Sequence, residues 1–280
     1  MISDNFVKRI GVMQGRFSPI RNGRIQSFPW ENWRTEFRLA SELNISKIEW
    51  TIDSEDFYKN PLVLKTAWNQ INNIRSEFCL TIPSVTCDYF MENPPWLNDP
   101  KQIFDDVILI LEGMAKIESS ILVIPLVDNA SIIQDQRKSE LFEFLQNLEP
   151  QLVMHKIRIA FETDLDPQDN KKFIAEFGSD TFGVNYDIGN SAAMGYKPQE
   201  EFDLYGSRII NVHVKDRKLG GSTVPLASGS ADFDGVFSGL AKIDYRGNYI
   251  LQTARASDGD HIGAIVTYKN QLLHWLGDSH

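Results

Sequence analysis

Four polar residues lie at the ends of four consecutive apolar runs in the second half of the chain. Glu162 ends IAFE, Asp187 ends VNYD, His213 lies within NVHV, and Gln252 ends YILQ. Such a set suits a divalent cation, because two carboxylates balance its charge while an imidazole nitrogen and an amide oxygen complete the shell. A helix cap would explain one acidic residue alone, and a core position would explain one histidine. Four in succession predict a metal site formed by Glu162, Asp187, His213 and Gln252.

These runs belong to a series of eight β-like segments separated by stretches with helical periodicity. Neighbouring segments start about 25 to 41 positions apart, which is the length of one βα unit. Several are almost continuously apolar, as in ILVIPL and IRIAF, a pattern typical of strands buried on both faces. The expected strands are Arg9–Met13, Lys47–Ile52, Leu80–Thr86, Ile121–Leu126, Ile157–Glu162, Phe182–Asp187, Ile209–Val214 and Tyr249–Gln252.

Eight βα units in one unbroken run predict an α/β fold, a closed (β/α)8 TIM barrel that takes up residues 1–280 as a single domain. The carboxyl ends of the strands in such a barrel converge at one mouth, which would bring the four polar residues together. No GxGxxG or GxxxxGK[ST] motif follows any of these strands, so a nucleotide-binding sheet is not favoured.

The charge and composition of the chain limit the classes of partner that it could bind. The formal net charge of −10 and the lack of a lysine- or arginine-rich run argue against nucleic acid. No apolar stretch is long enough to span a membrane and the first residues hold no signal-like run, so we expect a cytoplasmic protein with no membrane partner. Cys79 and Cys87 are then expected to be reduced thiols. The oligomeric state stays open, with a homodimer as one option.

The motifs at these strand ends also resemble a known family. They are IAFETD, GVNYDIGN, INVHVKDR and GSADFDGVFSGLAKIDYRGNYILQ, with IGVMQGRFSP and IEWTID nearer the N-terminus. The sequence is similar to the xylose isomerase-like barrel superfamily, which includes sugar and sugar-phosphate isomerases and epimerases, inosose dehydratase and endonuclease IV. The resemblance extends over essentially the whole chain.

The resemblance implies roles for particular residues. Glu162, Asp187 and His213 match three of the four metal ligands of the family, and the fourth, usually a glutamate, is Gln252 here. In the family's epimerases two glutamates move protons on opposite faces of the substrate, whereas an amide has no useful acid or base character near neutral pH. Asn190 stands where the family often has a histidine that contacts the substrate. One divalent ion is the implied cofactor, Mn²⁺ first, with Zn²⁺, Co²⁺ and Mg²⁺ also suited to these donors.

The implied activity is a divalent-metal-dependent isomerase or epimerase of a sugar or sugar phosphate, with Glu162 as the base and a metal-stabilised enediolate as intermediate. Isomerisation on one face needs only this base. Inversion needs a second acid, for which Lys215 is the candidate, because strand alternation points it to the side of His213 and points Asp216 away. Two alternatives stay open: a dehydratase of the inosose dehydratase type, and a sugar-binding barrel in which Gln252 has ended catalysis. An endonuclease IV-like activity is disfavoured, because only one of the five histidines lies at an expected strand end.

Further residues are expected to contact the substrate, a small sugar or sugar phosphate. Glu49 and Trp50 lie in the second strand, where a carboxylate could bind hydroxyl groups and an aromatic ring could stack on a sugar. Arg217 follows the seventh strand and Arg255 the eighth, and the late βα loops of such barrels often bind phosphate. With Asn190, these form the predicted substrate-binding set: Glu49, Trp50, Asn190, Arg217 and Arg255.

Overall fold

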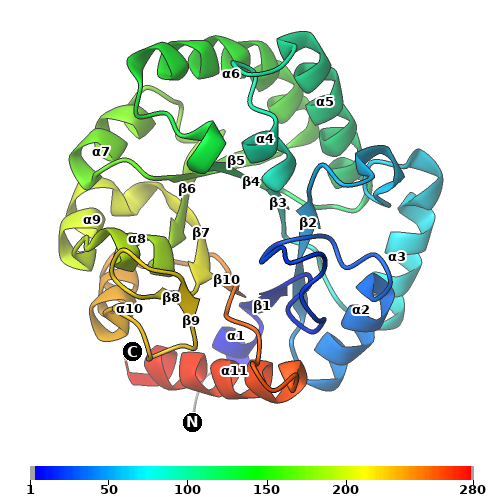
Figure 1. Ribbon diagram of the computed structural model, residues 1–280, viewed down its shortest axis with the longest axis vertical. Coiled ribbons are helices and arrows are strands. Elements are labelled where there is room, and N and C mark those ends of the chain that lie inside the picture. The colour runs from blue at the N-terminus through cyan, green and yellow to red at the C-terminus, as the bar shows by residue number, and fades with distance from the viewer. Residues whose placement is uncertain (1–3, 279–280) are drawn as a thin grey trace.

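The computed structural model of the protein describes residues 4–278 and shows a closed barrel of parallel strands ringed by helices (Figure 1). Each strand pairs with its neighbour in the barrel order, and β10 closes the ring between β7 and β1. The predicted (β/α)8 TIM barrel is confirmed, although residues 1–3 and 279–280 of the expected domain lie outside the described part. The barrel strands are β1 (Ile10–Met13), β2 (Lys47–Ile52), β3 (Ser84–Cys87), β4 (Ile121–Leu126), β5 (Arg158–Thr163), β6 (Phe182–Asp187), β7 (Ile209–Val214) and β10 (Tyr249–Leu251).

Helices connect the strands and form the outer layer. A short antiparallel hairpin of β8 (Asp216–Arg217) and β9 (Thr223–Val224) follows β7 at the mouth. Among the helices of residues 4–278, none combines the length and the apolar character needed to cross a membrane. The helices are α1 (Asp4–Val7), α2 (Trp33–Glu42), α3 (Trp68–Glu77), α4 (Asp88–Glu92), α5 (Pro100–Lys116), α6 (Asp135–His155), α7 (Pro167–Ala175), α8 (Ile188–Met194), α9 (Pro198–Tyr205), α10 (Phe233–Lys242) and α11 (His261–Asp278).

The hydrophobic core lies between the strands and the helices, as the packing around β2 illustrates. The ring of Trp50 is fully buried and contacts Phe28 and Trp33, with ring centroids 5.3 and 5.5 Å away. Its Nε1 donates a hydrogen bond of 3.0 Å to Oδ1 of Asn60. Burying a side chain of this kind contributes roughly 1.5–3 kcal/mol. Because Trp50 points outwards, its strand neighbour Glu49 points into the barrel.

The third strand is shorter than expected and begins later. The sequence predicts Leu80–Thr86, whereas β3 spans Ser84–Cys87. Thr81 forms only an isolated bridge with Lys47, and Pro83, which has no N–H, precedes the strand. The carbonyl of Pro83 instead accepts from the backbone N–H groups of Ser120 and Ile121. The chain is thus anchored to the start of β4 before regular pairing begins.

A long segment after β1, residues 14–32, folds over the mouth; we call it the rim segment. It turns at Gly15, whose φ of +83° favours glycine. Both carboxylate oxygens of Glu36 accept from the Gly15 N–H. Arg255 donates from Nε to the carbonyls of Gly15 and Ser18, at 2.9 Å each, and from Nη1 to Ile25 at 2.5 Å. The segment after the last strand therefore fixes the segment after the first.

Candidate active site at the barrel mouth

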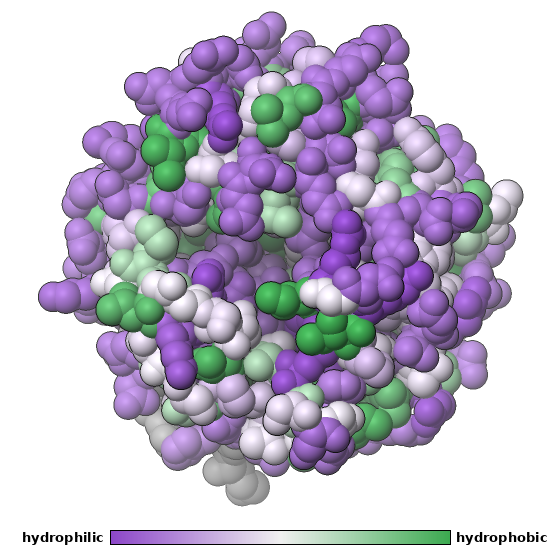
Figure 2. All heavy atoms as spheres, in the orientation of Figure 1, coloured by the Kyte–Doolittle hydropathy of each residue, from purple (hydrophilic) through white to green (hydrophobic). Residues whose placement is uncertain are grey.

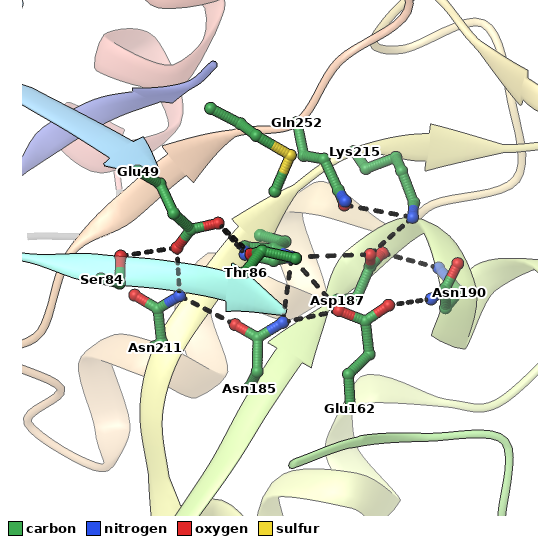
Figure 3. Close-up of polar contacts among 12 residues, drawn as sticks. Glu49, Ser84, Thr86, Glu162, Asn185, Asp187, Asn190, Asn211, Lys215 and Gln252 are labelled. Atoms are coloured by element: carbon green, nitrogen blue, oxygen red, sulfur yellow. Dashed lines mark hydrogen bonds and ion pairs between the residues drawn. The ribbon is translucent and has the colours of Figure 1, made fainter. Parts of the chain in front are cut away.

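The expected ligands on three neighbouring strands lie close together at the mouth of the barrel, and Figure 3 shows two of them, Glu162 and Asp187. Glu162 is the fifth residue of β5, Asp187 ends β6, and His213 lies opposite Asp187 in the register of β6 and β7. Each offers one ligand atom, and the three atoms lie within 4.8 Å of one another. All three side chains are buried. Parallel pairing places equivalent strand ends at one edge of the sheet, which explains why residues so far apart in sequence converge.

The imidazole of His213 lies between two carboxylates. Nε2 is 2.7 Å from Oε1 of Glu49, and Nδ1 is 3.2 Å from Oε2 of Glu162. Burial lowers the pKa of His213, but Glu49 and Glu162 outweigh this effect and raise it to about 10. When Nδ1 gives up its proton, Glu49 still accepts from Nε2–H and fixes the tautomer whose Nδ1 lone pair faces the other two ligands.

Glu49 is a partner of His213 rather than a substrate ligand, which corrects the sequence-based expectation. Its side chain has no exposed surface. Oε2 accepts from Ser84 Oγ at 2.6 Å and from Asn211 Nδ2 at 3.1 Å, while Oε1 accepts from Thr86 Oγ1 at 2.7 Å. Burial raises the pKa of Glu49, but His213 and these hydrogen bonds outweigh it and leave it below its usual value. Every lone pair that could meet a sugar hydroxyl is already used.

Two asparagines that the sequence reasoning missed link the carboxylates. Asn211 donates to Oδ1 of Asn185 at 3.0 Å, and Asn185 donates to Oε2 of Glu162 at 2.8 Å (Figure 3). Both side chains are buried. The signal that could have found them is spacing, because each precedes a ligand by two positions on its strand and must share that ligand's inward face.

Lys215 contacts both Asp187 and Gln252, on the side of Asp187 away from the two asparagines (Figure 3). Lys215 Nζ lies 2.6 Å from Oδ2 of Asp187 and 3.2 Å from Oε1 of Gln252. As strand alternation predicts, Lys215 points towards the side of His213. We call Glu162, Asp187 and His213, the three expected metal ligands, the ligand group. Gln252 lies near this group, but its contact is with the ammonium of Lys215, and direct binding of a metal by its oxygen stays a prediction.

Asn190 and Arg217 form the outer edge of the site. Asn190 donates from Nδ2 to Oε1 of Glu162 at 2.5 Å, and its Oδ1 accepts from Nη1 of Arg217 at 2.9 Å. Arg217 also donates from Nε and Nη2 to the carbonyl of Gly221, at 3.0 and 2.8 Å. Asp187 caps α8 by accepting from the Asn190 N–H at 2.9 Å. Asn190 thus lies beside Glu162, and Arg217 lies beside Asn190; their contact with a substrate stays a prediction.

Three other predicted or considered residues have structural contacts. Trp50 packs in the outer core, so the expectation that it stacks on a sugar is wrong. Arg255 holds the rim segment, and any contact with substrate stays a prediction. Asp216 turns away from the site, as expected, and accepts from the N–H groups of Gly229 and Ala231.

Several buried polar atoms on the β1–β3 side of the mouth lack a hydrogen-bond partner within the described part of the chain, as does Oδ1 of Asn211 on the side of the expected metal ligands. Those on the β1–β3 side include Nε2 of Gln14, Nε of Arg16 and Oδ2 of Asp88. Arg16 is otherwise held by Gln26 and the Ile25 carbonyl. Figure 2 shows a largely hydrophilic depression at the centre of this face. Buried polar groups are normally satisfied, so these atoms have capacity for further hydrogen bonds.

The ligand group fits a divalent cation. Two carboxylates, a tautomer-fixed imidazole and a nearby amide oxygen are donors that Mn²⁺, Zn²⁺ and Mg²⁺ accept. The ammonium of Lys215 lies 2.6 Å from Oδ2 of Asp187, so one carboxylate of this cluster already accepts a positive charge as its partner. Glu162, Asp187 and His213 are therefore the residues that would hold the ion.

A model of the family described as "Xylose isomerase-like TIM barrel" matches residues 37–271. The chain belongs to this family. In sequence it is similar to the putative L-ribulose-5-phosphate 3-epimerase SgbU of Escherichia coli (strain K12), with 35% identity over 89 residues. That stretch is 29% of this chain and only 31% of the curated relative.

Solved structures share the fold of this xylose isomerase-like barrel at low sequence identity. The IolI protein, whose structure has a bound zinc atom, has a TM-score of 0.76 at 15% identity, and the match covers 97% of this chain and 99% of IolI. A xylose isomerase-like TIM-barrel protein from Mycobacterium smegmatis in complex with magnesium has a TM-score of 0.68 at 14% identity, covering 95% and 97%. Barrels of this fold are thus seen with different divalent ions.

Proposed function

We propose that this chain is a divalent-metal-dependent isomerase or epimerase that acts on a small sugar or sugar phosphate, with Glu162 as the base. The observation that carries the proposal is the convergence of Glu162, Asp187 and His213 within 4.8 Å at the mouth. The partial similarity to a putative L-ribulose-5-phosphate 3-epimerase supports a ketose phosphate as the first substrate to test. Mn²⁺ is the proposed ion, with Zn²⁺, Co²⁺ and Mg²⁺ as alternatives.

A bound divalent ion would supply positive charge that acidifies a C–H bond beside a carbonyl group. Glu162 would accept that proton. Burial raises the pKa of this carboxyl, but His213 and Lys215 outweigh the effect and lower it to about 2, so the group is ionised at neutral pH. Asn185 and Asn190 hold one oxygen each and fix the direction in which the carboxylate meets the substrate.

The surrounding residues would orient the sugar. Lys215 is placed beside Asp187 and Gln252, where its ammonium would donate to an oxygen that gains negative charge during proton removal. Asn190 and Arg217 would direct hydroxyl or phosphate oxygens at the outer edge. Proton return to the neighbouring carbon gives an aldose–ketose isomerisation, and return to the opposite face of the same carbon gives an epimer.

The test has two steps. Metal content is measured by mass spectrometry in the wild type and in His213→Ala, with His155→Ala, a histidine at the end of α6, as the matched control. We expect about one equivalent in the wild type and control, and near none in His213→Ala. The loaded protein is then incubated in D₂O with L-ribulose 5-phosphate and a panel of other ketoses, aldoses and their phosphates. Deuterium entry at carbon supports the proposal, and its absence across the panel contradicts it.

One observation favours a second candidate, a sugar-binding barrel without turnover. Gln252 supplies an amide in place of an ionisable group, and the ammonium of Lys215 already contacts both Gln252 and Asp187. A protein of this kind would bind sugars without exchanging carbon-bound protons. Sugar binding seen by calorimetry, combined with silent exchange, would favour this candidate over the enzyme.

A further inference from the structure

The carboxyl group of Asp88 lies at the mouth and has no role in the proposed metal binding or proton removal. Asp88 directly follows β3 and starts α4. It lies two positions after Thr86, whose side chain points into the barrel and bonds to Glu49, and its charged neighbours include Glu162 and Arg16. Asp88 is 7% exposed, and its Oδ2 is buried without a hydrogen-bond partner.

The other carboxyl groups on this side of the mouth are already engaged in the described part of the chain. Glu36 accepts from the Gly15 N–H and from Ser18 Oγ. Asp53 accepts from the N–H groups of Phe28 and Glu55. Because these two carboxyl groups hold the rim segment and the backbone after β2, they are not free to exchange protons with a substrate. Asp88 is the carboxyl here that keeps an open oxygen.

The surroundings of Asp88 keep it protonated near neutral pH. Burial raises the pKa of Asp88 most, followed by the negative charge of Glu162, and together with Glu92 and Asp53 they bring it to about 8. Arg16 acts in the opposite direction. A neutral carboxyl group can donate a proton, and Asp88 reaches the mouth from the end of β3, whereas Glu162, the proposed base, reaches it from β5. An acid and a base on different strands of one mouth form the arrangement that proton transfer on two faces of a substrate requires.

We propose that Asp88 is the second proton-transfer residue of this site and takes the role that the amide of Gln252 cannot perform. This inference rests on the proposed function. Glu162 removes a proton from the carbon beside the carbonyl, and the electron pair of the C–H bond moves into an enediolate. Asp88 then gives its proton to the opposite face of that carbon, leaving Asp88 ionised and Glu162 protonated. Proton exchange with water restores both groups before the next turnover.

The decisive measurement separates proton removal from product formation. The metal-loaded protein is incubated in D₂O with L-ribulose 5-phosphate and a panel of ketose phosphates, and deuterium entry and epimer formation are followed together by NMR. In Asp88→Asn we expect deuterium entry to stay within about threefold of wild type, because Glu162 is intact. Epimer formation should fall about 100-fold or more, the usual loss when a general acid is removed.

Asp164→Asn is the matched control. Asp164 also has a buried oxygen without a partner, but it bonds to Ser131 and its charged neighbour is Asp128, which is outside the site. We expect this variant to keep both rates. If Asp164→Asn uncouples the two rates as strongly as Asp88→Asn, the assignment to Asp88 is wrong.

A second variant guards against a purely structural effect. Asp88→Ala should lose epimer formation, and added acetate or formate should restore part of it, because a small acid can take the vacated position. Lack of rescue together with equal loss of exchange and product in both Asp88 variants would overturn the inference and leave the proposed function intact. If the wild type exchanges with no substrate in the panel, the proposed function fails and this role fails with it.

Discussion

The two halves of the barrel mouth differ in how their charged groups are paired. On the β5–β10 side, charged groups are bonded to one another: His213 contacts Glu49 and Glu162, and Lys215 contacts Asp187. On the β1–β3 side, Arg16 is bonded to neutral groups, Gln26 and the Ile25 carbonyl, and Asp88 keeps a buried oxygen without a hydrogen-bond partner. Unpartnered atoms occur on the other side too, at Oδ1 of Asn211, so the difference lies in the ion pairs. A network of buried ion pairs resists rearrangement, so it can hold an ion in fixed geometry. Charged groups outside such a network gain more from a ligand, so they are suited to a substrate that comes and goes.

The largest effect is expected when the proposed base on the β5–β10 side, Glu162, is replaced. Glu162→Gln should lower the rate of carbon-bound proton exchange by about 10²–10⁴-fold, because the amide cannot accept a proton. Deuterium incorporation by NMR measures the effect. The variant keeps an oxygen for Asn185 or Asn190, so circular dichroism should show a folded barrel. An exchange rate near wild type would mean that another group is the base.

A smaller effect is expected from the carboxylate beneath the ligand group. Glu49→Gln removes the charge that fixes the tautomer of His213, and metal affinity should fall about 10- to 100-fold. Isothermal titration with Mn²⁺ and Zn²⁺ measures the change. Asp53→Asn, a buried carboxyl on the other side, serves as the control and should leave affinity unchanged. Equal losses in both variants would show that the two halves are not separable.

The pH dependence of the metal-free protein sharpens the contrast further. The pKa of His213 is raised from 6.5 to about 10, so the folded state holds this proton more tightly than the unfolded state does. The resulting stabilisation is fully present below about pH 6.5 and is lost as the pH rises through about 10. Urea unfolding in the presence of a chelator should therefore show stability declining over this range. The decline should be weaker in Glu49→Gln, and a wild type with constant stability would contradict the proposed charge arrangement.

The smallest effect should come from the rim segment. Arg255→Ala removes three hydrogen bonds to backbone carbonyls, a loss of about 2 kcal/mol. The melting temperature should fall by about 4 °C, measured by scanning calorimetry. Metal stoichiometry should stay unchanged, because the contacts of Arg255 lie on the other half of the mouth. A parallel loss of bound metal would show that the rim segment supports the ligand group.

The sequence predicted the barrel and the convergence of Glu162, Asp187 and His213 because both depend on local signals, while the role of these residues as metal ligands stays a prediction. Apolar runs of fixed spacing define the strands, and Glu162, Asp187 and His213 lie at the ends of those runs. Parallel pairing then brings them together without further information. The error at Trp50 was avoidable, because adjacent strand residues face opposite ways and Glu49 and Trp50 cannot both point into the barrel.

The remaining features of the site depend on contacts that no local pattern records. Glu49 and His213 are 164 positions apart, and the polar role of Glu49 follows from that one contact across the barrel. The charged neighbours of Asp88, among them Arg16 and Glu162, likewise come from segments far away in the sequence. Periodicity predicts which side of a strand a residue occupies, but the partner it meets there depends on the closed barrel.

The bonds from Arg255 to the rim segment have a consequence for synthesis. Their partners are 230 to 240 positions apart in the chain, so a polypeptide emerging from the ribosome makes nearly the whole barrel before this latch can form. Until then the carbonyls of Gly15, Ser18 and Ile25 lack the hydrogen bonds from Arg255. The first loop to be made is therefore among the last to be fixed, and a prematurely terminated chain would hold much of the barrel but lack an ordered entrance.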